Sequence, residues 1–294
     1  MIRQFWLTNS DNTTFSLNGN NIANTLSFLH EPNGLGYSVN INTVKLGNTD
    51  VILNETYNLG SISGDLIFFG KPQYVYQQYQ SFLSFLSKKP ITMHYQPPNA
   101  SDSYNCLVRV VSVEKSEINH DNKGLHCPIQ FYRQSMWYND NPNELDAYNR
   151  IEVGKSYPLD RPYSYGAISL ENIPLANSGM TDASLKIEVY GSCTNPEWAL
   201  YDVESNQYGA CKILGTYDYV RVDSGDLTEE IYLERSGASI PNAINYQDLT
   251  VGNPQQTYVT FLRLRSGTSK LAFNLGENFN GHAHITWSNA YVSV

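Results

Sequence analysis

The sequence predicts a mainly β chain of two β-sandwich domains, the first of which carries a single packed α-helix. Three observations support this fold class. The chain has 294 residues, enough for two domains of about 150 residues each. Short alternating segments recur along it between turns rich in Gly, Asn and Ser. Tyr contributes 22 residues while charged residues make up only 16%, a balance that favours half-buried β-surfaces over solvated helices.

One segment, residues 73–87, has the periodicity of an amphipathic helix. Its apolar positions recur at i, i+3, i+4 and i+7, and they are Tyr79, Phe82, Leu83 and Leu86. Lys88-Lys89-Pro90 follows, where cations suit the negative end of a helix and proline cannot continue it. We therefore expect a helix over residues 73–87 that buries this face against the N-terminal sheet.

The other segments of the first half have the pattern of strands. Residues 37–44 alternate, residues 65–69 precede the helix, and residues 91–95 follow it directly. Residues 104–114 and 125–133 are predicted to pair as a long hairpin around a polar turn at 119–124. One helix packed on this sheet would cover its apolar face, and we assign residues 1–136 to this domain.

Residues 137–164 interrupt the strand pattern and are predicted to be a linker, because they contain Asn139-Asp140-Asn141-Pro142 and little apolar periodicity. Residues 165–294 form the second predicted domain. Its strand-like segments are residues 185–191, 217–224, 230–233, 257–265, 282–287 and 290–294. Their even spacing is typical of a β-sandwich. Segment 257–265 has apolar residues on both faces, so we expect it to be a central strand.

Charge and hydropathy exclude several classes of protein. The net charge is −9 and the cations are scattered, whereas a nucleic-acid-binding surface needs a clustered basic face. No run of apolar residues is long enough for a transmembrane helix, and the N-terminus lacks the apolar region of a signal peptide. We expect a protein that stays in the cytosol unless it leaves as part of a larger particle.

The four cysteines, Cys106, Cys127, Cys193 and Cys211, show no C-x-x-C spacing. In a cytosolic product, such cysteines are expected to be reduced, buried, small hydrophobic residues. We therefore predict neither zinc ligation nor disulfides for them.

No catalytic motif is present: the sequence lacks G-x-S-x-G, H-E-x-x-H, a Walker loop and G-x-G-x-x-G. Carboxylates of the second half could in principle supply a glycosidase pair, and they are Asp202, Glu204, Asp223, Asp226, Glu229 and Glu230. Most of them lie in turn-like contexts. The run at 223–226 lacks the oxygen spacing of a calcium loop, so a plain turn is expected. We predict no catalytic residue, cofactor or metal.

Sugar binding is the one ligand class with candidate residues. Residue types that stack on sugars or bond their hydroxyls occur in the second half, and they are Asn195, Trp198, His282, His284 and Trp287. The two histidines share one strand face and could also bind zinc with a third ligand. The favoured alternatives are a polar outer face for the histidines, opposite Ala283 and Ile285, and core positions for both tryptophans.

Several short motifs of the first half occur in a characteristic order. The chain opens with Met-Ile-Arg-Gln-Phe, residues 33–37 are Asn-Gly-Leu-Gly-Tyr, and Gly60 and Gly64 frame the strand before the helix. The helix then ends in Ser-Lys-Lys-Pro. In this order the first half resembles the distal tail proteins of siphophages that infect Gram-positive bacteria. The second half matches that family in architecture and length only.

The resemblance implies a structural virion protein at the phage tail tip, or baseplate. In such a protein the N-terminal domains would form a hexameric ring that joins the tail tube protein to the tail-associated fibre hub protein. A central channel would pass DNA and the tape measure. The C-terminal domain would be galectin-like and project toward receptor-binding proteins used in host adhesion. The resemblance implies no enzyme, no specific nucleic-acid binding and no membrane insertion, and it implies assembly in the host bacterial cytoplasm.

Two other functions are kept as alternatives. A carbohydrate-binding or glycoside-cleaving β-sandwich protein would act as a small species rather than as a ring. Another baseplate component, such as a receptor-binding subunit, would be expected to carry fibrous or repeated segments, which this sequence lacks.

Overall fold

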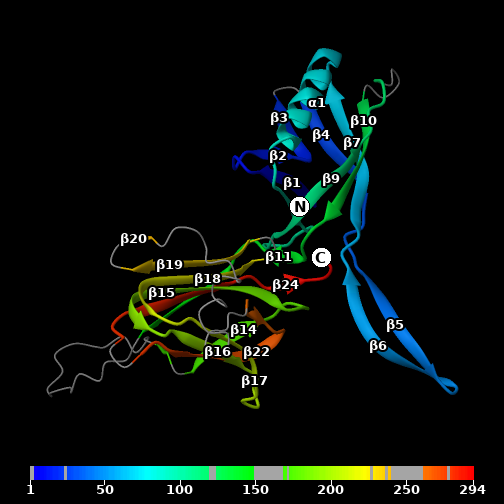
Figure 1. Cartoon of the computed structure of the whole chain (residues 1–294). Helices are drawn as coiled ribbons and strands as arrows, with labels where there is room; N and C mark the ends of the chain where they lie inside the picture. Colours follow the sequence, from blue (N-terminus) through cyan, green and yellow to red (C-terminus); the bar gives the residue numbers. More distant parts are fainter. Residues whose placement is uncertain are drawn as a thin grey trace. The chain divides into compact units, whose positions relative to one another are not determined.

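The computed structural model describes residues 3–22, 25–118, 124–148, 168–170, 172–225, 228–235, 238–239, 261–276 and 279–294. The chain divides into two compact units, one made of Met1–Asn141 with Tyr291–Val294, the other of Pro142–Ala290. Most strands pair antiparallel, and the one helix of the described residues lies in the first unit (Figure 1). The mainly β fold class with a single helix is thus confirmed. The galectin-like character of the second unit stays a prediction.

The elements of the first unit follow one another in this order: β1 (Gln4–Asn9), β2 (Thr14–Ser16), β3 (Asn18–Ile22), β4 (Thr25–Asn33), β5 (Ser38–Leu46), β6 (Thr49–Asn58), β7 (Ser61–Gly70), α1 (Pro72–Leu86), β8 (Ile91–Gln96), β9 (Tyr104–Val113), β10 (Gly124–Arg133) and β11 (Trp137–Asn139). The predicted hairpin of β9 and β10 is confirmed. Residues 119–123 of its predicted turn lie outside the described residues.

The main sheet of the first unit closes on itself. Its order is β2-β1-β8-β9-β10-β7-β4-β3, so β2 and β3 stand at opposite ends although they follow one another in the chain. Leu17, between them, joins the two ends. Its N–H donates to the carbonyl of Phe5, and its own carbonyl accepts from the N–H of Leu29, both at 2.8 Å. Leu17 thus continues the hydrogen bonding from β1 on one side to β4 on the other.

The predicted helix is present as α1, from Pro72 to Leu86. Its buried residues are Val75, Gln78, Tyr79, Phe82, Phe85 and Leu86. The prediction that Leu83 is buried is wrong: its side chain is 37% exposed. Leu83 lies about 100° around the helix from Phe82, and the buried stripe follows the 3.6-residue period through Phe85 instead. No helix in the described ranges has the length and apolar character needed to cross a membrane.

Phe82→Ala is expected to lower the free energy of unfolding by about 3–5 kcal/mol, because its ring is fully buried and packs against Phe15 and Phe68. Leu83→Ala, at the neighbouring exposed position, is the matched control and should change that free energy by less than about 1 kcal/mol. Urea denaturation of the two variants measures the difference. Equal losses would contradict this burial pattern.

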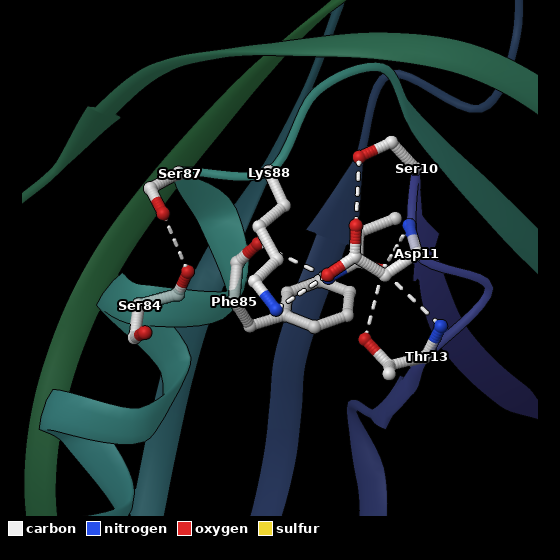
Figure 2. A network of polar contacts seen from close by, with 8 residues as sticks. Ser10, Asp11, Thr13, Ser84, Phe85, Ser87 and Lys88 are labelled. Carbon is white, nitrogen blue, oxygen red and sulfur yellow. Dashed lines mark hydrogen bonds and ion pairs between the residues drawn. The ribbon is translucent and has the colours of Figure 1, made fainter.

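Side chains tie the end of α1 to the turn after β1, as Figure 2 shows. The Ser87 hydroxyl donates to the carbonyl of Ser84 at 2.7 Å. The sequence predicts that Lys88 serves the negative end of the helix, but its ammonium pairs instead with the carboxylate of Asp11. The amide of Asn9, buried beside this pair, accepts a hydrogen bond from the N–H of Asp11 at 3.1 Å. The helix end is therefore anchored through a tertiary contact.

All four cysteines are buried thiols outside any disulfide, as predicted. Burial raises the pKa of Cys127 to about 12 and that of Cys193 to about 11, and it raises the pKa of Cys106 well above its ordinary value. Thiolate is the reactive form, so at pH 8 the native thiols are expected to be silent toward Ellman's reagent. Denaturant should release the reactivity of all 4 cysteines of the chain. Rapid labelling of the native protein would contradict this.

The elements of the second unit follow in this order: β12 (Asn143–Tyr148), β13 (Ile168–Ser169), β14 (Ile173–Asn177), β15 (Ala183–Thr194), β16 (Glu197–Tyr201), β17 (Gln207–Lys212), β18 (Thr216–Gly225), β19 (Thr228–Arg235), β20 (Ala238–Ser239), β21 (Arg263–Leu264), β22 (Gly267–Asn274) and β23 (His282–Trp287). A last short strand, β24 (Ala290–Tyr291), lies at the boundary of the two units.

These strands form two sheets, which Figure 1 shows as two layers. One has the order β13-β12-β23-β15-β18-β19-β20, with β21 paired to β15, and the other has the order β14-β22-β16-β17. Each sheet buries one face. Ile187 and Ile285 are cross-strand partners on the buried face of the first sheet, and Leu200 and Leu271 are partners on that of the second. This arrangement is a β-sandwich.

Two segments differ from their prediction. Residues 137–148 of the predicted linker form β11 and β12, and Trp137 is fully buried in the first unit. The Asn and Pro residues between these short strands hide their alternation. Residues 149–164 of that linker lie outside the described residues. The last residues, Tyr291–Val294, belong to the first unit and not to the second.

The segment 257–265 is described only from residue 261 onward. Leu262 and Leu264 are buried, as its apolar character predicts. In the described part of this segment, only Arg263 and Leu264 form a strand, β21. Among the described strands, β21 pairs with β15 alone. The described part of this segment is therefore not a central strand. Its apolar residues reflect burial in the core of the sandwich.

Candidate assembly surface

In the described part of the chain, β5 and β6 pair only with each other and form a two-stranded sheet within the first unit. Their register runs from Ser38↔Asn58 at the base to Leu46↔Thr49 at the tip. Gly47, at φ +65°, and the residue after it make the turn, and a Gly in the left-handed region suits a tight hairpin. Figure 1 shows this hairpin projecting from the rest of its unit. The ten residues of β6 span roughly 30 Å.

The hairpin exposes large apolar side chains. The exposed fraction reaches 63% for Leu46, 57% for Ile52 and 65% for Leu53. The full set in and beside the hairpin is Tyr37, Ile41, Val44, Leu46, Val51, Ile52, Leu53 and Tyr57. Single exposed apolar residues are ordinary, but a contiguous group of this kind marks an interaction site.

The register of the hairpin distributes these side chains unevenly. Near the base, one face carries Val39, Ile41 and Tyr57 together with Glu55. The opposite face is polar, and its residues are Ser38, Asn40, Asn42, Asn54, Thr56 and Asn58. A β-bulge at Leu53 then shifts the pairing. Beyond the bulge, Val44, Val51 and Leu46 lie on one face, and Ile52 lies on the other face with Thr43 and the charged partners Lys45 and Asp50.

An isolated two-stranded hairpin is at best marginally stable in water, and nearly every residue of these two strands is exposed in the described structure. Burying its apolar faces under another surface would contribute about 25 cal/mol for each Å² removed from water. The hairpin therefore has the chemistry of a surface that a partner covers. We call it the assembly hairpin, residues Ser38–Leu46 with Thr49–Asn58.

A buried arginine holds the base of the assembly hairpin. The Arg133 side chain is fully buried, and its Nη2 donates to the carbonyl of Gly36, just before β5, at 3.2 Å. Its Nε donates to the carbonyl of Leu59, just after β6, and its Nη1 to that of Val292 at 3.4 Å. Burial lowers the pKa of the guanidinium below its ordinary value. One side chain thus fixes both ends of the hairpin.

The residues predicted as glycan contacts lie in the second unit, where they contact other protein side chains. Trp198 and Trp287 are buried, with 1% and 8% of their surface exposed. His282 and His284 do share the outer face opposite the buried Ala283 and Ile285, as the alternation predicts. Glycan binding by these four residues stays a prediction.

The two histidines make different contacts. Tyr148 and Tyr190 both stack on the His282 ring, with centroids at 5.4 and 4.8 Å. The Nδ1 of His284 bonds to a carboxylate oxygen of Asp146 at 2.7 Å. Both imidazoles therefore have protein partners, and the alternation of β23 places Trp287 on the opposite face from them.

The carboxylates considered for catalysis mostly have structural partners. Glu230 pairs with Arg221 at 2.7 Å, and Asp202 accepts two backbone N–H groups of its own turn. Ser224, which follows Asp223 in the chain, is fully buried, and its hydroxyl lies within hydrogen-bond distance of the carbonyls of Leu185 and Leu262. Asp226 lies outside the described residues. Within the described ranges, no group of three or more His, Cys, Asp and Glu side chains could hold a metal ion.

In one polar cluster of the first unit, an imidazole bonds to a hydroxyl through one ring nitrogen and to a carboxylate through the other. His94 lies 3.1 Å from Thr8 Oγ1 through Nε2 and 3.1 Å from Asp140 through Nδ1. Trp6 stacks on the His94 ring at 5.0 Å. Burial alone would raise the pKa of Asp140, but hydrogen bonds from His94, and from Asn105 at 2.6 Å, hold it below its usual value. Thr8 lies in β1, His94 in β8 and Asn105 in β9, so these contacts join the three strands.

Comparisons with known proteins agree with this fold. Residues 4–134 match the family described as "Distal tail protein, N-terminal domain". A chain in the structure of the phage P2 baseplate, in its activated conformation with Ca, is 17% identical and has a TM-score of 0.61, with 100% of both chains covered. SPP1 Dit, described as a paradigm of the hub adsorption apparatus in Gram-positive infecting phages, is 14% identical with a TM-score of 0.60. That match covers 96% of this chain and 98% of SPP1 Dit. A comparison with curated protein sequences finds no match.

Proposed function

Because residues 4–134 match the N-terminal domain of the distal tail proteins, we propose that the chain is a distal tail protein of a phage and that six copies form a ring that is the hub of the tail tip. The observation that carries this proposal is the assembly hairpin, whose exposed apolar side chains need a partner. Every copy in a ring presents two different surfaces, one to each neighbour. The hairpin is one of them, and it docks on the first unit of the next copy.

The ring joins the tail tube protein on one side to the tail-associated fibre hub protein on the other. Its bore, built by the first units, is neutral to acidic and passes DNA and the tape measure. The net charge of −9 supports this role, because a wall without basic clusters does not retain DNA. Tight, salt-sensitive binding of duplex DNA by the purified ring would contradict this part of the proposal.

The second unit serves as the attachment point for receptor-binding proteins and has no enzymatic activity. The protein is assembled in the host bacterial cytoplasm and leaves in the virion. Support comes from its β-sandwich, in which Glu230 and Asp202, two of the carboxylates considered for catalysis, bond to neighbouring protein groups. Polysaccharide-hydrolase screens are expected to stay silent. Robust turnover, abolished by changing Asp223 or Glu230, would support the glycosidase alternative.

Negative-stain electron microscopy with native mass measurement of the purified chain tests the ring. We expect sixfold rings and a native mass six times that of the 33.2 kDa subunit. A chain that stays at the subunit mass up to micromolar concentration, in the range where stable interfaces associate, would overturn the proposal.

A further inference from the structure

The second unit contains a hollow of about 530 Å³ that the proposed ring does not use. Strand ends and turns build it: Ser192 and Thr194 from β15, Glu197 from β16, Lys212 from β17 and Asn274 from β22. The hollow lies within the size range of small-molecule sites. Binding residues often occupy such turns at the end of a rigid sheet scaffold.

The rim of this hollow is built from tight, hydrogen-bonded turns. Asn195 adopts the left-handed conformation, φ +48°, which is uncommon for a residue with a side chain. Its Oδ1 accepts from the N–H of Gly215 at 2.9 Å, and its own N–H donates to the Gly215 carbonyl at 2.7 Å. The N–H of Thr194 donates to the carbonyl of Leu275 at 3.1 Å. These bonds hold the backbone of the rim and the side chain of Asn195 in place before any ligand arrives.

The lining has two parts. One part consists of groups that can donate and accept hydrogen bonds, and the other is a small apolar floor. The hydroxyls of Ser192 and Thr194 and the amides of Asn195 and Asn274 serve as donors and acceptors. Leu275 and Phe279, each 4% exposed, form the apolar part. A sugar has the matching surface, because each of its hydroxyls donates and accepts while its ring C–H groups are apolar. From this chemistry we propose that the hollow binds one neutral sugar unit of a glycan.

The charges in the hollow favour a neutral ligand over an anionic one. Lys212 is the cation of the lining, and its Nζ lies 3.0 Å from a carboxylate oxygen of Glu197, its direct cross-strand partner. The pair presents a donor and an acceptor without net charge. A phosphate or uronate would have to displace Glu197 or lie beside it, which costs repulsion between like charges.

Alternation also explains why the site lies here and not at the predicted tryptophans. Glu197 and Trp198 are neighbours on β16, so their side chains point to opposite faces of the sheet. Trp198 enters the core, and Glu197 faces the hollow. The proposal does not depend on the ring, so each can fail alone.

Ligand-observed NMR with the full-length chain tests the proposal, using the methyl glycosides of glucose, galactose, N-acetylglucosamine and rhamnose as probes. We expect saturable binding of at least one probe with a dissociation constant of about 1 mM. Asn274→Ala and Glu197→Gln should each weaken it by about tenfold, as the loss of one or two hydrogen bonds implies. Gln207→Ala, exposed at the other end of β17, is the matched control and should bind as the wild type does.

Thermal unfolding of each variant shows that it is folded, and because the changed side chains are solvent-accessible we expect little effect on stability. Three outcomes overturn the proposal: no saturable binding of any probe up to about 100 times the expected constant, binding that both variants leave unchanged, or binding of inorganic phosphate in place of the neutral glycosides.

Discussion

Replacing Ile52 with aspartate is expected to dissociate the ring while the subunit stays folded. Ile52 is 57% exposed in the first unit, so the change removes little packing there, and the free energy of unfolding should shift by no more than about 0.5 kcal/mol. Inside a contact between copies, the same carboxylate would be buried without a partner. Burying even a neutral polar group in that way costs roughly 2–7 kcal/mol, and a charge costs more. The cost recurs at every contact of the ring.

The matched control is Asn54→Asp, which adds the same charge to the polar face of the same strand. Sedimentation velocity of the wild type and both variants at equal concentration measures the outcome. We expect Ile52→Asp to sediment as subunits and Asn54→Asp to keep the assembled species. If Ile52→Asp still forms rings, the hairpin is not the contact. If the wild type itself sediments as single subunits, the ring proposal fails before the hairpin is tested.

The strengths and errors of the sequence prediction have physical causes. The helix is predicted within one residue at each end, because its apolar stripe and the following Lys-Lys-Pro are strong local signals. Leu83 is assigned wrongly because periodicity gives the width of an apolar face but not which edge of it meets the sheet. The closure of the first sheet through Leu17 depends on two long-range hydrogen bonds, and no local pattern reveals them.

The assembly hairpin shows a different limit. Its first strand is predicted, but β6 is not, although Gly47-Asn48 between two alternating runs is a recognisable hairpin turn. Even with both strands assigned, apolar alternation would suggest a strand that is half-buried in its own domain. Only the structure shows that both strands are exposed along nearly their whole length, and that exposure makes the hairpin a candidate site. The hollow of the second unit is hidden in the sequence for a related reason: its residues come from four strands.

Arg133→Met is expected to cause the largest loss of stability among the substitutions considered. The side chain donates to three backbone carbonyls, those of Gly36, Leu59 and Val292. A hydrogen bond from a charged donor contributes about 1.5–3 kcal/mol, so the three together set a loss of roughly 4.5–9 kcal/mol. In the variant, water can reach the part-buried carbonyls of Gly36 and Leu59, which offsets part of this loss. Relief of the desolvated guanidinium offsets part of this loss, and we expect about 5 kcal/mol in urea denaturation.

Arg109→Met on the exposed face of β9 makes the same chemical change without these bonds, and it should cost less than about 0.5 kcal/mol. Arg133→Lys keeps the charge but loses the planar fork that reaches several carbonyls, so an intermediate loss is expected. Because Gly36 and Leu59 flank the assembly hairpin, hydrogen exchange of residues 38–58 should accelerate in Arg133→Met more than exchange in β8 or β9. Wild-type stability of Arg133→Met, or uniform acceleration across the unit, would show that the arginine does not anchor the hairpin on which the proposed ring depends.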